Sequence, residues 1–115
     1  MKFHAYHSLE YLQDMLAGIY GKRNAKLYSS TDLLLHIFEE ASVVAETMRK
    51  EDNGKIEHDM AVLFAWVLTF CNSRKINLAR AVFGKYSGIC PYCKRKENCV
   101  CISVEAKPKR FRCVE

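Results

Sequence analysis

The feature that most constrains the fold is the apolar run from Met60 to Cys71, MAVLFAWVLTFC, in which Thr69 is the only interruption. A helix that is apolar nearly all round must be buried on several sides. The run is too short to cross a bilayer, and three further modest helices of one chain can hardly cover it. The sequence therefore predicts a homodimer or a higher homo-oligomer, with this helix near the centre of a shared bundle.

Helical periodicity continues on the N-terminal side of this run. Ser8 can cap a first helix whose apolar residues recur every three or four positions, and Gly21 is placed to end it. After a basic and polar connection, Ser30 can cap a longer helix that runs to about Lys50, with one apolar stripe.

The apolar run itself belongs to a third helix, predicted from about Ile56 to Asn72, after a turn at residues 51–55. Asn77 can cap a fourth helix from Leu78 to about Tyr86. No strand pattern of comparable length is present. We therefore expect an all-α fold of about four helices in residues 1–88, followed by a cysteine-rich segment and a basic tail in residues 89–115.

Composition places the chain among ordered globular proteins, because 50 % of its residues are hydrophobic, 27 % are charged and two are proline. The N-terminus, MKFHAYHSLEYLQ, lacks the apolar run of a signal peptide. We expect a cytoplasmic protein that does not enter a membrane. In a reducing compartment, clustered cysteines indicate metal or redox chemistry more often than structural disulfides.

Four of the six cysteines lie within CPYCKRKENCVC, at positions 90, 93, 99 and 101. A CxxC turn can turn both of its sulfur atoms to one side, and the CxC pair, Cys99 and Cys101, can close a tetrahedron around a metal ion with Cys90 and Cys93. Zn²⁺ is the metal that four thiolates favour, and a site with no open position would be structural. Reducible thiols and other metals remain alternatives.

The stretch HIFEEASVVAETMRK, residues 36–50, resembles the EExxE motif of the MazG-like nucleoside triphosphate pyrophosphohydrolases. Other segments are similar to further parts of that family: IYGKRN, residues 19–24; MAVLFAWVL, residues 60–68; CNSRKINLARAVFGKY, residues 71–86; and the cysteine segment, residues 88–101. The resemblance implies an all-α fold in which acidic residues on two helices hold Mg²⁺ against the phosphates of a nucleotide.

The acidic motifs do not match the family at every position. Glu39 and Glu40 match the first two acids of EExxE, but Val43 stands at the third. In the second motif, ExxD, Asp59 stands at the Glu position and Val62 at the Asp position. Mg²⁺ prefers oxygen ligands, which valine cannot provide. The resemblance therefore implies a remnant Mg²⁺ site in a protein that binds nucleotide, or acts as a dimeric interaction module, with little or no hydrolysis.

Two other functions remain open at this stage. One is an active Mg²⁺-dependent enzyme that converts a nucleoside triphosphate to the monophosphate and pyrophosphate. Whether the protein only binds a nucleotide or also hydrolyses it, the resemblance implies that Asn72 and Lys85 lie near the phosphates. The other is a nucleic-acid-binding zinc module. Residues 94–115 hold seven Lys or Arg and three Glu, so they carry most of the formal net charge of +5, and KPKRFR, residues 107–112, could contact phosphates.

Overall fold

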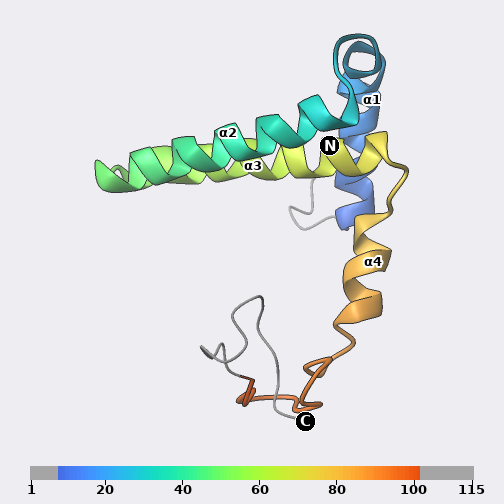
Figure 1. The fold of residues 1–115 in the computed structure, drawn as a ribbon, viewed down its shortest axis with the longest axis vertical. Coiled ribbons are helices and arrows are strands. Elements are labelled where there is room, and N and C mark those ends of the chain that lie inside the picture. Colours follow the sequence, from blue (N-terminus) through green and yellow to red (C-terminus); the bar gives the residue numbers. More distant parts are fainter. Residues whose placement is uncertain (1–7, 102–115) are drawn as a thin grey trace, which may run out of the picture. The chain divides into compact units, whose positions relative to one another are not determined.

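A computed structural model describes residues 8–101, and these residues form four helices and no strand. The helices are α1 (Leu9–Leu27), α2 (Ser30–Arg49), α3 (Asn53–Ser73) and α4 (Leu78–Lys85) (Figure 1). The predicted all-α class is confirmed. The chain divides into two compact units, Met1–Leu78 and Ala79–Glu115, so α1 to α3 form one unit and nearly all of α4 belongs to the other.

Helix α1 begins as predicted but is longer than predicted. The Ser8 hydroxyl accepts a hydrogen bond from the Tyr11 backbone N–H at 3.1 Å, which caps the helix. Gly21 does not end α1, because the helix continues to Leu27 and is closed by a bond from the Tyr28 N–H to the Asn24 carbonyl at 2.9 Å. A glycine inside a helix costs only about 1 kcal/mol, and the turn that follows it places Asn24 in the interior.

The start of α2 is one residue earlier than predicted, because Ser29 and not Ser30 is the cap. The Ser29 hydroxyl accepts from the Asp32 N–H at 3.1 Å, and the Asp32 carboxylate accepts from the Ser29 N–H at 2.9 Å. This reciprocal pair satisfies two backbone donors at the helix end. The bond from the Ser29 backbone lowers the pKa of Asp32.

Helix α3 begins at Asn53 and not near Ile56, so the turn before it is shorter than predicted. The Asp52 carboxylate accepts from the Lys55 N–H at 3.1 Å and caps the helix. Glu51 adopts a left-handed backbone conformation, with φ of 57°, which reverses the chain direction. A carboxylate cap allows the helix to start within the polar stretch that the pattern assigned to the turn.

Helices α2 and α3 form an antiparallel hairpin and lie side by side along their lengths (Figure 1). Three contacts fix their register: the Ser30 and Ser73 hydroxyls are 3.0 Å apart, the ring centroids of His36 and Trp66 are 4.3 Å apart, and Thr47 donates to Asp59 at 2.8 Å. The middle of α2 therefore runs alongside the middle of α3.

Helix α1 packs against α3, near the end of the hairpin where α2 begins and α3 ends (Figure 1). Within the described part of the chain, the buried hydrophobic side chains are Leu16, Leu33, Leu68 and Cys71. Burial raises the pKa of the Cys71 thiol, which is a small core residue as expected.

Within residues 8–101, helix α3 keeps part of its apolar surface exposed. Met60 and Phe64 are exposed on it, as is Phe38 on α2. Of the helices in residues 8–101, none combines the length and apolar character needed to span a membrane.

Candidate metal centre

The four cysteines of the C-terminal segment lie together. The ligand atoms of Cys90, Cys93, Cys99 and Cys101 are all within 4.8 Å of one another. The Sγ–Sγ distances are 3.6 Å between Cys90 and Cys101, 3.7 Å between Cys93 and Cys99, and 3.7 Å between Cys99 and Cys90. Elsewhere in residues 8–101, no group of three or more His, Cys, Asp or Glu side chains is placed to hold a metal ion.

These distances match the geometry of a tetrahedral metal site. Four sulfur atoms at about 2.3 Å from a central Zn²⁺ would be separated from one another by about 3.8 Å. A disulfide, in contrast, requires an S–S distance of about 2.05 Å, so none of these three pairs is bonded. The cluster can therefore hold a metal ion such as zinc.

The loop that carries the cysteines is shaped by its own backbone. The Lys94 N–H donates to the Cys90 carbonyl at 2.9 Å, and the Cys90 N–H donates to the Arg95 carbonyl at 2.8 Å. Lys94 and Asn98 adopt left-handed conformations, with φ of 67° and 55°. The Arg95 guanidinium donates to the Asn98 carbonyl at 2.9 Å. Lys94 and Arg95 therefore act within the loop, in addition to carrying charge.

Backbone N–H groups point at the sulfur atoms. The Tyr92 N–H lies 3.4 Å from the Cys90 Sγ, and the Cys101 N–H lies 3.2 Å from the Cys99 Sγ. Hydrogen bonds from the backbone of Val100 and Arg95 lower the pKa of Cys93 to about 7. Such donors favour the thiolate, which is the form that binds a metal.

Two cysteines of the cluster differ from Cys93 in their chemistry. The pKa of Cys99 is raised: the Cys101 backbone N–H acts to lower it, but burial and the sulfur atoms of Cys93 and Cys90 outweigh that bond. Cys90, Cys93 and Cys99 are in no disulfide, whereas Cys101 is disulfide-bonded. A site with four thiolates therefore requires Cys101 to be reduced.

The residues predicted to form a remnant Mg²⁺ site lie in the helical hairpin. Glu39 is exposed and Glu40 is half-buried on α2, while Asp59 on α3 exposes only 3 % of its surface. Both oxygens of Asp59 are engaged, by the Thr47 hydroxyl at 2.8 Å and by the Lys55 ammonium at 3.1 Å. The Thr47 bond lowers the pKa of Asp59. These three acids are not brought together as a ligand group within the described residues.

Asn72, a predicted nucleotide contact, is used to join α1 to α3. Its side-chain carbonyl accepts from the Gln13 amide at 2.9 Å, and its own amide donates to the Gln13 backbone carbonyl at 3.1 Å. Lys85, the other predicted contact, belongs to the second unit, where its ammonium donates to the Tyr92 hydroxyl at 2.7 Å and lies 4.8 Å from the centroid of that ring. The Tyr92 bond raises the pKa of Lys85.

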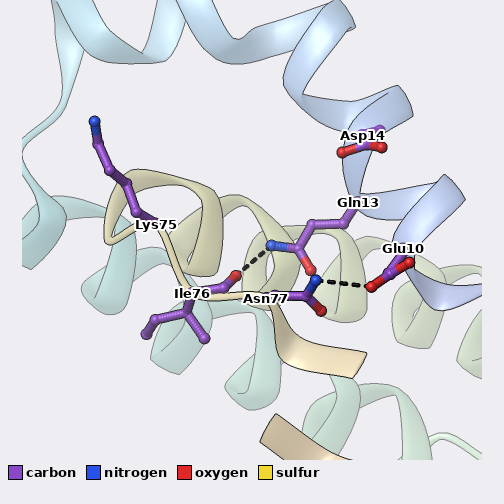
Figure 2. Close-up of a pocket in the computed structure, with 6 residues that line it drawn as sticks. All are labelled: Glu10, Gln13, Asp14, Lys75, Ile76 and Asn77. Atoms are coloured by element: carbon purple, nitrogen blue, oxygen red, sulfur yellow. Dashed lines mark hydrogen bonds between the residues drawn. The ribbon is translucent and has the colours of Figure 1, made fainter. Parts of the chain in front are cut away.

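A polar hollow of about 360 Å³ lies where the connection after α3 meets α1 (Figure 2). Gln13 occupies its wall and is fully engaged, because its amide donates to Asn72 and to the Ile76 carbonyl at 2.6 Å and its carbonyl accepts from the Leu78 N–H at 3.2 Å. Asn77 donates to Glu10 at 2.8 Å, as Figure 2 shows. These bonds give the hollow a structural role in holding the connection on α1.

An aromatic cluster was not predicted from the sequence. His36 stacks on Trp66 with an interplanar angle of 10°, and Tyr28 meets the His36 ring edge-on at a centroid distance of 4.8 Å. The imidazole Nδ1 lies 2.9 Å from the Asp32 carbonyl. His36 and Trp66 are thirty positions apart, so only the register of the hairpin brings them together. The buried polar residues Gln13 and Asn24 also carried no sequence signal.

No protein-family model, curated protein or solved structure matches the chain. The basic tail, KPKRFR at residues 107–112, lies outside the described residues, so its predicted contact with phosphates stays a prediction.

Proposed function

We propose that the C-terminal segment binds one zinc ion through Cys90, Cys93, Cys99 and Cys101 and that this ion has a structural role. The observation that supports the proposal most strongly is the set of sulfur–sulfur distances of 3.6 to 3.7 Å, which is close to the edge of a zinc–thiolate tetrahedron. The backbone donors at the sulfur atoms add to it, because they favour the thiolate form. Four protein ligands leave no open position for a substrate.

Elemental analysis of protein purified with a reductant and without chelator tests the zinc proposal. We expect about one zinc per chain, a strongly reduced content in Cys93→Ser, and an unchanged content in Cys71→Ala, whose thiol belongs to the helical core. Zinc content near zero in the unaltered protein, with all four thiols free to react, would contradict the proposal.

For the helical unit, we propose a MazG-like protein that binds a nucleotide and hydrolyses it weakly or not at all. The register of the hairpin supports this assignment. Contacts join His36 to Trp66 and Thr47 to Asp59. The EExxE-like stretch, which lies between His36 and Thr47, therefore runs alongside the stretch of α3 that carries the second motif. Two facing helices are the arrangement that the resemblance implies.

Weak hydrolysis follows from the residues at this place. Valine stands at two of the positions where the family has acids, and the Asp59 carboxylate is already engaged by Thr47 and Lys55. A divalent ion would have to break these bonds before Asp59 could act as a ligand. Mg²⁺ prefers near-octahedral oxygen coordination, so Glu39 and Glu40 alone would leave most positions to water and to the phosphates.

Dimerisation is part of this proposal, and it is supported by the small core of the described residues. Four hydrophobic side chains are buried there, while a larger set remains exposed on α1 to α3, including Ile19, Leu35, Phe38, Met60 and Phe64. A second copy of the chain would cover exposed apolar side chains of this number. Light scattering at micromolar concentration should give the mass of two chains or more, and a monodisperse monomer would contradict dimerisation.

Isothermal titration with nonhydrolysable nucleoside triphosphates, with and without Mg²⁺, tests the nucleotide proposal. We expect binding that depends weakly on Mg²⁺, because few carboxylates are available to hold the ion. Absence of heat at every concentration would indicate that the helical unit binds no nucleotide and serves as an interaction module. Robust release of pyrophosphate by the unaltered protein, abolished by Glu40→Gln, would instead identify an active enzyme.

A further inference from the structure

A second hollow, of about 310 Å³, lies between α1 and α3 within the helical unit. Its volume is at the lower end of the range for small-molecule sites, about 300 to 1,000 Å³. The α1 side contributes Tyr20, Arg23 and Asn24, and the α3 side contributes Val62, Trp66 and Thr69. None of the described residues that line it is acidic.

Two polar side chains at this hollow are buried without a complete set of partners. Asn24 exposes 6 % of its surface and Thr69 exposes 9 %. The Asn24 carbonyl oxygen accepts from Arg23, but within residues 8–101 its Nδ2 group has no acceptor and the Thr69 hydroxyl has no partner. Buried polar groups are rarely left unpaired, because each costs free energy. Both residues line this hollow as well as an adjoining one of about 320 Å³, and a ligand bound here would supply the missing partners.

Arg23 supplies a positive charge that is already oriented. Its Nε and Nη2 groups donate to the Asn24 oxygen at 3.1 and 3.0 Å, and its guanidinium carbon lies 4.7 Å from the centroid of the Tyr20 ring. No carboxylate of the described residues forms an ion pair with it. The remaining N–H donors of the guanidinium are therefore available to an anion, for which arginine is well suited.

Trp66 and Val62 give the same hollow an apolar wall. The Trp66 ring is held in place by its stack on His36. A ligand that matches all of these groups has a flat aromatic part with hydrogen-bond acceptors and, attached to it, an anionic group. A nucleoside phosphate has this chemistry.

We propose that the hollow between α1 and α3 binds a nucleoside phosphate, with the base against Trp66 and within reach of Asn24 and Thr69, and with a phosphate at Arg23. This inference depends on the proposed nucleotide binding and adds its location and the residues that make it. The site differs from the predicted contacts Asn72 and Lys85, which are engaged elsewhere. It requires no divalent ion.

Trp66 is the only tryptophan of the chain, so its fluorescence reports on the hollow directly. Nucleoside mono- and triphosphates of all four bases should be titrated in the presence of a chelator that leaves the zinc centre loaded, and heat should be recorded in parallel. We expect saturable quenching of Trp66 in the unaltered protein. Arg23→Gln should weaken binding by about tenfold, as loss of a charge-assisted hydrogen bond does.

Lys26 provides a matched control, because it is a cation one turn further along α1 that does not line the hollow. Lys26→Gln should change the affinity by no more than about twofold, the effect expected from a screened surface charge. Asn24→Leu should weaken binding as Arg23→Gln does, and far-UV circular dichroism would verify that it folds. Arg23→Gln is an exposed substitution and tests the site even if Asn24→Leu unfolds.

The outcomes separate this inference from the function on which it depends. Binding that is equally strong in Arg23→Gln, Asn24→Leu and Lys26→Gln would overturn the hollow as the site and leave nucleotide binding intact. Absence of both heat and quenching with the unaltered protein at millimolar nucleotide would overturn both. Binding that is lost in the first two variants and kept in the third would support both.

Discussion

Thr69→Val should make the ligand-free protein more stable, although the substitution removes a polar group from a polar site. Thr69 exposes only 9 % of its surface, and its hydroxyl has no partner in the described residues. Threonine and valine are both branched at Cβ, so helix propensity and packing change little. The change in the free energy of unfolding is then dominated by removal of the unpaired hydroxyl.

The size of the effect follows from the cost of an unpaired buried group, which is about 1 to 3 kcal/mol. The lower end applies, because Thr69 lines a hollow and keeps 9 % of its surface exposed. We expect an increase of about 1 kcal/mol in the free energy of unfolding, which corresponds to a rise of about 4 to 8 °C in Tm for a domain of this size.

Urea unfolding followed by far-UV circular dichroism measures this change without involving Trp66, which shares the hollow. The slope of the transition should stay constant, so that a shift in midpoint reports stability alone. Thr31→Val is the matched control, because Thr31 is exposed on α2 and its hydroxyl is in water. A loss of stability in Thr69→Val would refute the reasoning, since the hydroxyl would then be paired in the free protein and would not await a ligand.

Three further predictions test the hairpin. Val43→Glu combined with Val62→Asp should bring five carboxylates onto the facing helices and increase Mg²⁺ affinity or pyrophosphate release, while lowering stability in the absence of metal. Unchanged metal binding would contradict the motif register. Thr47→Val should lower stability at neutral pH. The pKa of Asp59 is lowered from 3.8 by the Thr47 bond, so this contribution is present above that value and is lost as the pH falls through the folded pKa. The difference in the free energy of unfolding between the unaltered protein and Thr47→Val should therefore vanish in acid. A difference that stays constant at all pH values would show that Thr47 stabilises the protein by packing and not through the Asp59 carboxylate. Leu68→Ala, at a fully buried position, should lower the free energy of unfolding by about 3 kcal/mol in a urea titration.

The sequence predicted the helices because their determinants are local. Apolar periodicity and the caps near Ser8 and at the start of α2 lie within a few residues of the structure they specify. The same holds for the cysteine cluster, in which all four sulfur atoms come from one loop. The predicted end of α1 is wrong because glycine commonly follows the last residue of a helix, whereas Gly21 lies within α1.

The candidate site in the helices could not be predicted to the same degree, because it depends on contacts between distant residues. Asp59 is a free acid in the sequence, and its bond to Thr47 follows only from the register of α2 on α3. Asn24 is an ordinary polar residue of a predicted basic connection, yet the extension of α1 carries it into the interior. Burial of a polar side chain is a tertiary property and has no local pattern.

The three bonds of the Gln13 amide have a consequence for hydrogen exchange. Residues 74–77 connect α3 to α4, and the N–H of Leu78, the first residue of α4, is bonded to a side chain of α1 at 3.2 Å and to no preceding turn of its own helix. Helix ends usually exchange by fraying, at a rate set by the nearest turn. Exchange at Leu78 should instead require the Gln13 side chain to release this N–H, so the amide would report how firmly α1 holds the connection after α3.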